Sequence, residues 1–118
     1  MRARPPALGT HRGRWQCRLA VADGYETLSG ERHTVYRLAD GLLLVFKPRG
    51  HREDVHAHPH PQRLRVLRGA LVVRTARAAV TLDADSPPLT LAPGRHHATE
   101  ALADTWLVAE AVGKRRGR

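Results

Sequence analysis

Apolar residues along this 118-residue chain come in short runs, and turn-forming residues separate the runs. Sequences such as Asp23-Gly24, Asp40-Gly41 and Asp85-Ser86-Pro87-Pro88 favour turns, because glycine tolerates positive φ and proline fixes φ. We find no helical period, and we predict strands at residues 15–21, 33–39, 42–47, 54–58, 62–68, 70–75, 78–83, 88–92, 96–100 and 105–112. Short strands with turn signals roughly every ten residues are typical of an all-β barrel or sandwich.

The segment 62–68 shows most clearly which side chains share a face. Side chains alternate across a strand, so Gln62, Leu64 and Val66 lie on one face and the two arginines between them on the other. The amide of Gln62 therefore faces the barrel interior together with the apolar residues.

Two histidines just before this strand point to metal chemistry. His56 and His58 are two residues apart, so they share a face if the segment is extended. Imidazole binds zinc, iron, nickel, manganese and copper, and neighbouring strands of a sheet can supply the other ligands. One His-x-His pair is a weak signal in a chain with eight histidines, and a solvated loop is the alternative. The inward amide of Gln62 favours the metal site.

The spacing around these histidines resembles the first signature of the cupin superfamily, G-x5-HxH-x(3,4)-E-x6-G. Gly50, His56, His58, Gln62 and Gly69 match it at every spacing. The one departure is Gln62, which stands where the family usually has glutamate.

A second segment, "LAPGRHHATEA" at residues 91–101, resembles the second cupin signature, G-x5-PxG-x2-H-x3-N. Gly94 and His97 fit this pattern. Pro93 is displaced by one position, the first glycine is missing, and Ala101 stands where the family has asparagine.

The resemblance implies that residues 15–112 form a single all-β domain, a cupin-type jelly-roll β-barrel with one divalent metal at its mouth. Zinc or iron is favoured, with nickel, manganese or copper as alternatives. The family spacing selects His97 over its neighbour His96, and Gln62 is either the fourth ligand or a hydrogen-bonding neighbour of the metal. The ligand set implied by the resemblance is His56, His58, Gln62 and His97. The resemblance also implies a homodimer with a small-molecule substrate or ligand in the barrel. The excess of arginine over lysine and the abundance of alanine suggest a bacterial source.

Three imidazoles and an amide are uncharged, so a divalent ion bound to them keeps its full charge toward the substrate. That favours Lewis-acid chemistry of the isomerase, cyclase or lyase type on an anionic or oxygen-rich small molecule. Oxygen-dependent chemistry stays open, because some cupin dioxygenases resemble this site in using three histidines on iron. The alternative function is a non-catalytic cupin that binds or senses a ligand, or serves as an accessory module.

The sequence does not identify a catalytic base among the remaining polar residues. The acid–base candidates are Glu100, Glu110, Tyr36 and Asp104. Glu100 lies opposite His97 if that strand is regular. The other histidines are interpreted as a loop residue at His60 and surface residues at His11, His33 and His51.

Charge is concentrated at the two ends of the chain. The net charge is +9, and residues 1–14 and 113–118 contain eight arginines and lysines and no acid. Residues 15–112 are nearly neutral, with twelve basic and eleven acidic residues. Basic tails of this kind are usually solvated and flexible, so we do not expect nucleic acid as a partner.

Few features of the sequence indicate the cellular compartment of the protein. Cys17 is the single cysteine, which excludes a disulfide framework within the chain. No apolar run approaches the roughly 18 residues of a membrane span, and the N-terminal residues lack the apolar stretch of a signal peptide. We therefore expect a cytoplasmic protein that does not bind membranes.

Overall fold

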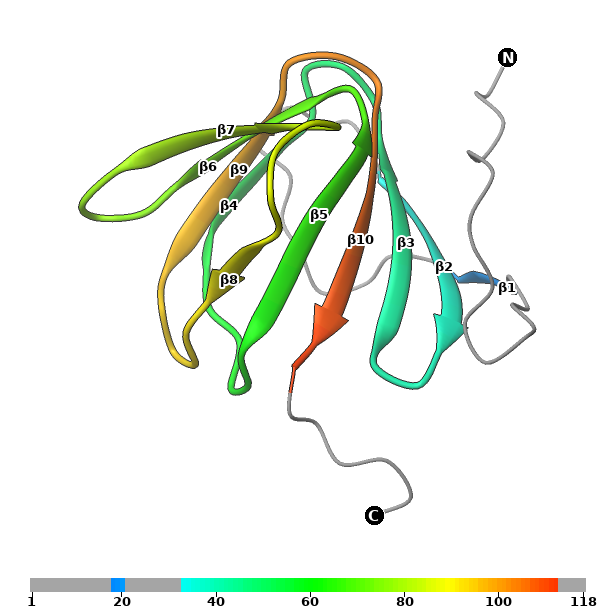
Figure 1. Cartoon of the computed structure of the whole chain (residues 1–118), viewed down its shortest axis with the longest axis horizontal. Coiled ribbons are helices and arrows are strands. Elements are labelled where there is room, and N and C mark those ends of the chain that lie inside the picture. Colours follow the sequence, from blue (N-terminus) through cyan, green and yellow to red (C-terminus); the bar gives the residue numbers. More distant parts are fainter. Residues whose placement is uncertain (1–17, 21–32, 113–118) are drawn as a thin grey trace.

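The computed structural model describes residues 18–20 and 33–112, and the chain there consists of strands and their connections (Figure 1). The strands are β1 (Arg18–Ala20), β2 (Thr34–Ala39), β3 (Leu42–Lys47), β4 (Arg52–His56), β5 (Gln62–Arg68), β6 (Ala70–Arg74), β7 (Ala79–Asp83), β8 (Leu89–Leu91), β9 (His97–Ala101) and β10 (Thr105–Ala111). Each predicted strand overlaps one of these ten. The predicted basic tails, residues 1–14 and 113–118, lie outside the described residues.

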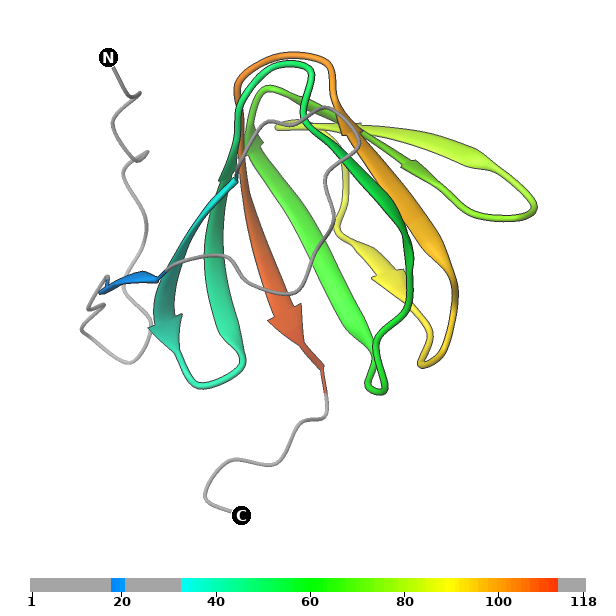
Figure 2. The ribbon, with the colours of Figure 1, turned by 180° about the vertical axis from the view of Figure 1, so that it is seen from behind.

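The strands form two antiparallel sheets. One has six strands in the order β1-β2-β3-β10-β5-β8, and the other has four in the order β4-β9-β6-β7. Seen from behind, β4 and β9 lie side by side, and the β6–β7 hairpin extends outward beyond them (Figure 2). The two-sheet arrangement confirms the predicted all-β class.

The main hydrophobic core lies between the two sheets. Leu64 and Val66 on β5 contribute to it, with Leu71 on β6 and Leu107 on β10, and each of these side chains is at most 4% exposed. Burying a side chain of this size contributes about 1.5–3 kcal/mol relative to leaving it in water. The alternation predicted for Gln62 to Val66 is confirmed, because Arg63 and Arg65 are exposed while Leu64 and Val66 are buried.

The six-stranded sheet also carries apolar residues on its outer face. Trp106 of β10 is 1% exposed and packs against Phe46 of β3, with ring centroids 4.8 Å apart. Leu42 and Leu44 of β3 belong to the same cluster. Strand β3 is therefore buried on both faces, which explains its continuous apolar run.

The two glycines of the first signature allow sharp turns just before β4 and just after β5. Gly50 and Gly69 have φ angles of 86° and 96°, a region that other residues rarely adopt. A side chain at Gly69 would also collide with the backbone oxygen of Asp104. Gly69 lets the chain pass from β5 in one sheet to β6 in the other.

Candidate metal centre

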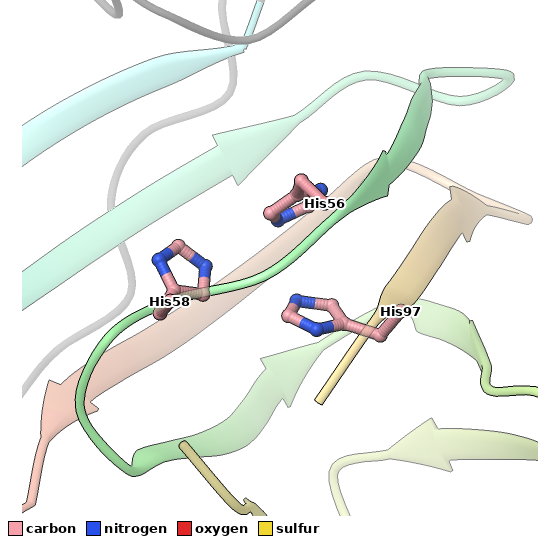
Figure 3. A group of neighbouring side chains, drawn as sticks. All are labelled: His56, His58 and His97. Carbon is pink, nitrogen blue, oxygen red and sulfur yellow. The ribbon is translucent and has the colours of Figure 1, made fainter. Parts of the chain in front are cut away.

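Three histidines converge where β4 and β9 lie together. His56 is the last residue of β4 and is paired with His97, the first residue of β9. His58 lies two residues further along, beyond the end of β4, and not within a strand as the predicted range 54–58 had it. Figure 3 shows the three imidazole rings close together, and one nitrogen atom of each ring lies within 4.8 Å of one nitrogen atom of each of the others.

Backbone carbonyls fix the orientation of two of these rings. His56 Nδ1 lies 2.8 Å from the carbonyl oxygen of Asp54, and His97 Nδ1 lies 3.1 Å from that of Arg95. A carbonyl oxygen can only accept, so Nδ1 carries the proton in each ring and the lone pair is on Nε2. This arrangement is the one in which histidines usually bind metals.

The surroundings keep two of the imidazoles neutral. Burial lowers the pKa of His58, and the positive charges that His56 and His97 can carry lower it further. Burial also lowers the pKa of His97, although its hydrogen bond to the Arg95 carbonyl acts in the opposite direction. Neutral imidazole is the form that binds a metal ion, so both rings are suited to do so near pH 7.

Gln62 lies in the same cavity as the three histidines. It is the first residue of β5, half-buried, and paired with Leu91 of β8 and Ala111 of β10. The structure thus brings the four predicted residues together, and it leaves the neighbouring His96 exposed.

Four further polar residues line this cavity: His33 and, not revealed by the sequence, Lys47, Glu53 and Thr99. The last three are 4%, 7% and 4% exposed. Lys47 Nζ donates to Glu53 Oε1 at 2.5 Å and to Thr99 Oγ1 at 3.3 Å. Thr99 Oγ1 in turn donates to Glu53 Oε1 at 3.0 Å. We call these residues the Lys47–Glu53–Thr99 cluster.

A β-bulge brings Glu53 into the cavity. The register between β4 and β9 shifts between Glu53, which pairs with Thr99, and His56, which pairs with His97. In a regular strand Glu53 and His56 would face opposite sides, because they are three residues apart. The extra residue turns both side chains inward.

Lys47 keeps the Glu53 carboxyl ionised. Burial raises the pKa of Glu53, but the charge and hydrogen bond of Lys47 outweigh this effect and lower the pKa to about 2. Burial lowers the pKa of the Lys47 ammonium, and the Glu53 carboxylate opposes that change. The cluster therefore holds a buried ion pair beside the histidines.

The interpretation of His33 and His51 as surface residues is wrong. They are 8% and 0% exposed, and His33 Nδ1 lies 3.1 Å from His51 Nε2. Burial, followed by the charges of Lys47 and His33, lowers the pKa of His51 to about 4. Both rings can be buried because they contact each other, although the two residues are eighteen positions apart in the sequence. His60 is in a loop as predicted, and His11 lies outside the described residues.

The four acid–base candidates lie outside the cavity lining. Glu100 accepts from Arg74, Glu110 accepts from Arg63, and Asp104 accepts from the backbone N–H of Arg49. Tyr36 packs against Trp106 on the outer face of the six-stranded sheet, with ring centroids 6.0 Å apart. Glu100 faces away from His97, as alternation along the strand predicts.

The cavity has a volume of about 70 Å³. Polar groups from the histidines, Gln62 and the Lys47–Glu53–Thr99 cluster meet aliphatic walls there. The aliphatic lining consists of Val35, Leu43, Val45, Leu64, Leu71, Leu107 and Ala109. A cavity of this size suits a ligand of a few non-hydrogen atoms or a few waters.

Among the described residues, no helix is long and apolar enough to cross a membrane.

No protein-family model and no curated protein sequence matches this chain. Solved structures match its fold. An RmlC-like cupin from Shewanella frigidimarina is 16% identical, with a TM-score of 0.59 over 89% of this chain and 91% of its own. A predicted oxalate decarboxylase from Thermotoga maritima is 14% identical, with a TM-score of 0.61 over 86% and 96%. CENP-C of Drosophila melanogaster, solved bound to CAL1, is 12% identical, with a TM-score of 0.61 over 87% and 83%. At these identities the similarity concerns the fold.

Proposed function

We propose that this chain, which has the fold of the small single-domain cupins, binds one divalent metal ion on His56, His58 and His97. The proposal rests on the convergence of three imidazoles, each of which contributes one nitrogen atom to a group within 4.8 Å of one another. Gln62 lines the same cavity and is the fourth ligand or a hydrogen-bonding neighbour of the ion.

The chemistry of the donor set fits such an ion. Carbonyl groups hold the protons of His56 and His97 on Nδ1, so Nε2 of each ring can bind. Imidazole nitrogens with an amide oxygen suit zinc or iron best, and nickel, manganese or copper are alternatives.

A divalent ion held by these uncharged ligands would polarise a bound carbonyl or lower the pKa of bound water, and a redox-active ion would permit oxygen-dependent chemistry. The chain's own residues define the surroundings. Carbonyl contacts orient the rings, the aliphatic walls exclude water, and the buried Lys47–Glu53 pair adds no net charge. We therefore propose a small-molecule enzyme of the isomerase, cyclase or lyase type, with an O₂-dependent enzyme as the other outcome.

The second candidate is a non-catalytic cupin that binds a ligand or assists a partner protein. Two observations favour it: none of the four acid–base candidates lines the cavity, and a structural neighbour, CENP-C, was solved bound to another protein. Turnover of any small molecule that is lost in a folded His56→Ala variant would exclude this candidate.

Metal analysis of protein purified without a histidine tag tests the metal site. We expect close to one equivalent of metal in the wild type, and its loss in His56→Ala with the fold retained. Zinc would indicate Lewis-acid chemistry, and iron would indicate oxygen chemistry. Less than about a tenth of an equivalent, with none taken up on soaking, would exclude the proposal.

The homodimer and the cytoplasmic location stay predictions. Light scattering of the purified chain measures the first directly, with about twice the monomer mass expected.

A further inference from the structure

The Lys47–Glu53–Thr99 cluster has hydrogen-bonding capacity that the chain does not use. An ammonium group has three donors, and Lys47 directs two of them to Glu53 Oε1 and Thr99 Oγ1. The hydroxyl of Thr99 donates to the same carboxylate oxygen. Within residues 33–112 this leaves one N–H of Lys47 and the second oxygen of Glu53 without a hydrogen bond. The cluster therefore offers the cavity one donor and one acceptor side by side.

A donor and an acceptor side by side favour some functional groups of a ligand over others. A hydroxyl group both donates and accepts, so it satisfies Lys47 and Glu53 together. A carboxylate can only accept, and it would lie against the ionised oxygen of Glu53. An ammonium can only donate, and it would lie against Lys47. Since all three residues are at most 7% exposed, a ligand group of the wrong kind leaves a buried polar atom without a hydrogen bond, which costs free energy of binding.

The strand register places the cluster next to the histidines. Thr99 follows His97 by two residues on the same face of β9, and its partner Glu53 is the next inward residue on β4 before His56. Two residues of a strand span about 7 Å. The cavity therefore has a histidine end and a hydroxyl-selecting end, separated by the length of a short carbon chain and flanked by Leu43 and Val45.

We propose that the natural ligand is a small hydroxycarboxylate, with its carboxylate at the histidine end and its hydroxyl on Lys47 and Glu53. The inference rests on the proposed metal centre, because an ion on neutral ligands supplies the positive charge that receives the carboxylate. Lys47, Glu53 and Thr99 are then specificity-determining residues. The cavity volume of about 70 Å³ limits the ligand to a few carbon atoms.

Calorimetric titration of the zinc-loaded full chain with 4-hydroxybutyrate and with butyrate tests the proposal. The two acids differ only in the terminal hydroxyl. We expect the wild type to bind the hydroxy acid about tenfold more tightly, the effect of one hydrogen bond to a charged group. Equal affinities, or no binding of either acid, would overturn the inference without any need for a variant.

Two double variants test whether Lys47 and Glu53 cause the preference for the hydroxy acid. Lys47→Met/Glu53→Leu replaces the buried pair with apolar side chains of similar size, so we expect a folded chain that binds both acids within about twofold. Arg74→Met/Glu100→Leu removes an exposed ion pair from the outer face of the four-stranded sheet, which also contains Glu53 and Thr99, and should keep the preference. A preference that persists in the first variant would overturn the assignment of the hydroxyl to Lys47 and Glu53.

Metal content measured on the same samples separates the two proposals. A zinc-loaded wild type without the preference contradicts this inference alone. A wild type that cannot retain zinc contradicts the proposed metal centre, and the placement of the carboxylate falls with it.

Discussion

The two polar ends of the cavity differ in how their groups are satisfied. At the Lys47–Glu53–Thr99 cluster, opposite charges meet at 2.5 Å with side chains only 5% and 9% exposed. At the histidine end, three imidazole rings bring like groups together, and a positive charge on His56 would lower the pKa values of both His58 and His97. The cluster is thus balanced in charge by its own residues, whereas the histidine end is suited to receive a cation. Removal of one residue should therefore have different consequences at each end.

The largest expected effect is at the histidine end. We expect His97→Ala to weaken zinc binding at least about 100-fold, because only two of the imidazoles remain. Competition with a chromophoric chelator measures the change. His96→Ala is the matched control, since His96 is the adjacent exposed residue. Equal loss in both variants would contradict the assignment of His97.

At the cluster, the main effect is on folding. Glu53→Leu leaves the buried Lys47 ammonium without a counter-charge, so we expect the free energy of unfolding to fall by about 3–5 kcal/mol in a urea titration. Lys47→Met/Glu53→Leu should lie within about 1 kcal/mol of the wild type. A double variant as unstable as the single one would show that the two charges also stabilise other parts of the structure.

The pH dependence of the free energy of unfolding distinguishes the contribution of the buried histidine pair from that of the ion pair. The pKa of His51 is lowered from 6.5 to about 4, so the unfolded chain binds a proton in this range that the folded chain does not. Stability is complete above pH 6.5 and decreases by about 1.4 kcal/mol per pH unit as pH falls toward 4. The ordinary pKa of Glu53 is 4.5 and is lowered to about 2, so its contribution is lost only as pH falls from 4.5 to 2.

Urea titrations at several pH values measure both windows. His51→Leu should reduce the slope between pH 6.5 and 4, to which the lowered pKa values of His58 and His97 also contribute, and should leave the lower window unchanged. An unchanged slope in this variant would contradict the assignment to His51.

The smallest expected effect is that of Gln62→Glu, which restores the usual carboxylate of the cupin pattern. A negative charge near the ion should tighten zinc binding about tenfold if the carboxylate lies close to it. The same chelator competition measures this change. An unchanged affinity would place Gln62 outside the ligand set, as a hydrogen-bonding neighbour.

Regular strands explain what the sequence could predict. In β5 and β9 the side chains alternate without interruption near the site, so the inward position of Gln62 follows from alternation, and that of His97 agrees with the resemblance to the second cupin signature. Each of the ten strands likewise overlaps a predicted one, and Gly50 and Gly69 of the first signature lie at turns with positive φ.

Irregular or doubly buried strands explain what the sequence could not predict. Glu53 reaches the cavity through a bulge in β4, and no residue type in that segment signals one. Lys47 ends a strand that is apolar on both faces, so alternation gives no inward side there. The burial of His33 and His51 depends on a contact between residues eighteen positions apart.

Anomalous diffraction from crystals of the full chain soaked in zinc is the most direct test of the metal site. We expect a single strong peak about 2.0–2.1 Å from one nitrogen of each of His56, His58 and His97. A peak bound elsewhere, or no peak at this site at saturating zinc, would contradict the assignment of these three ligands.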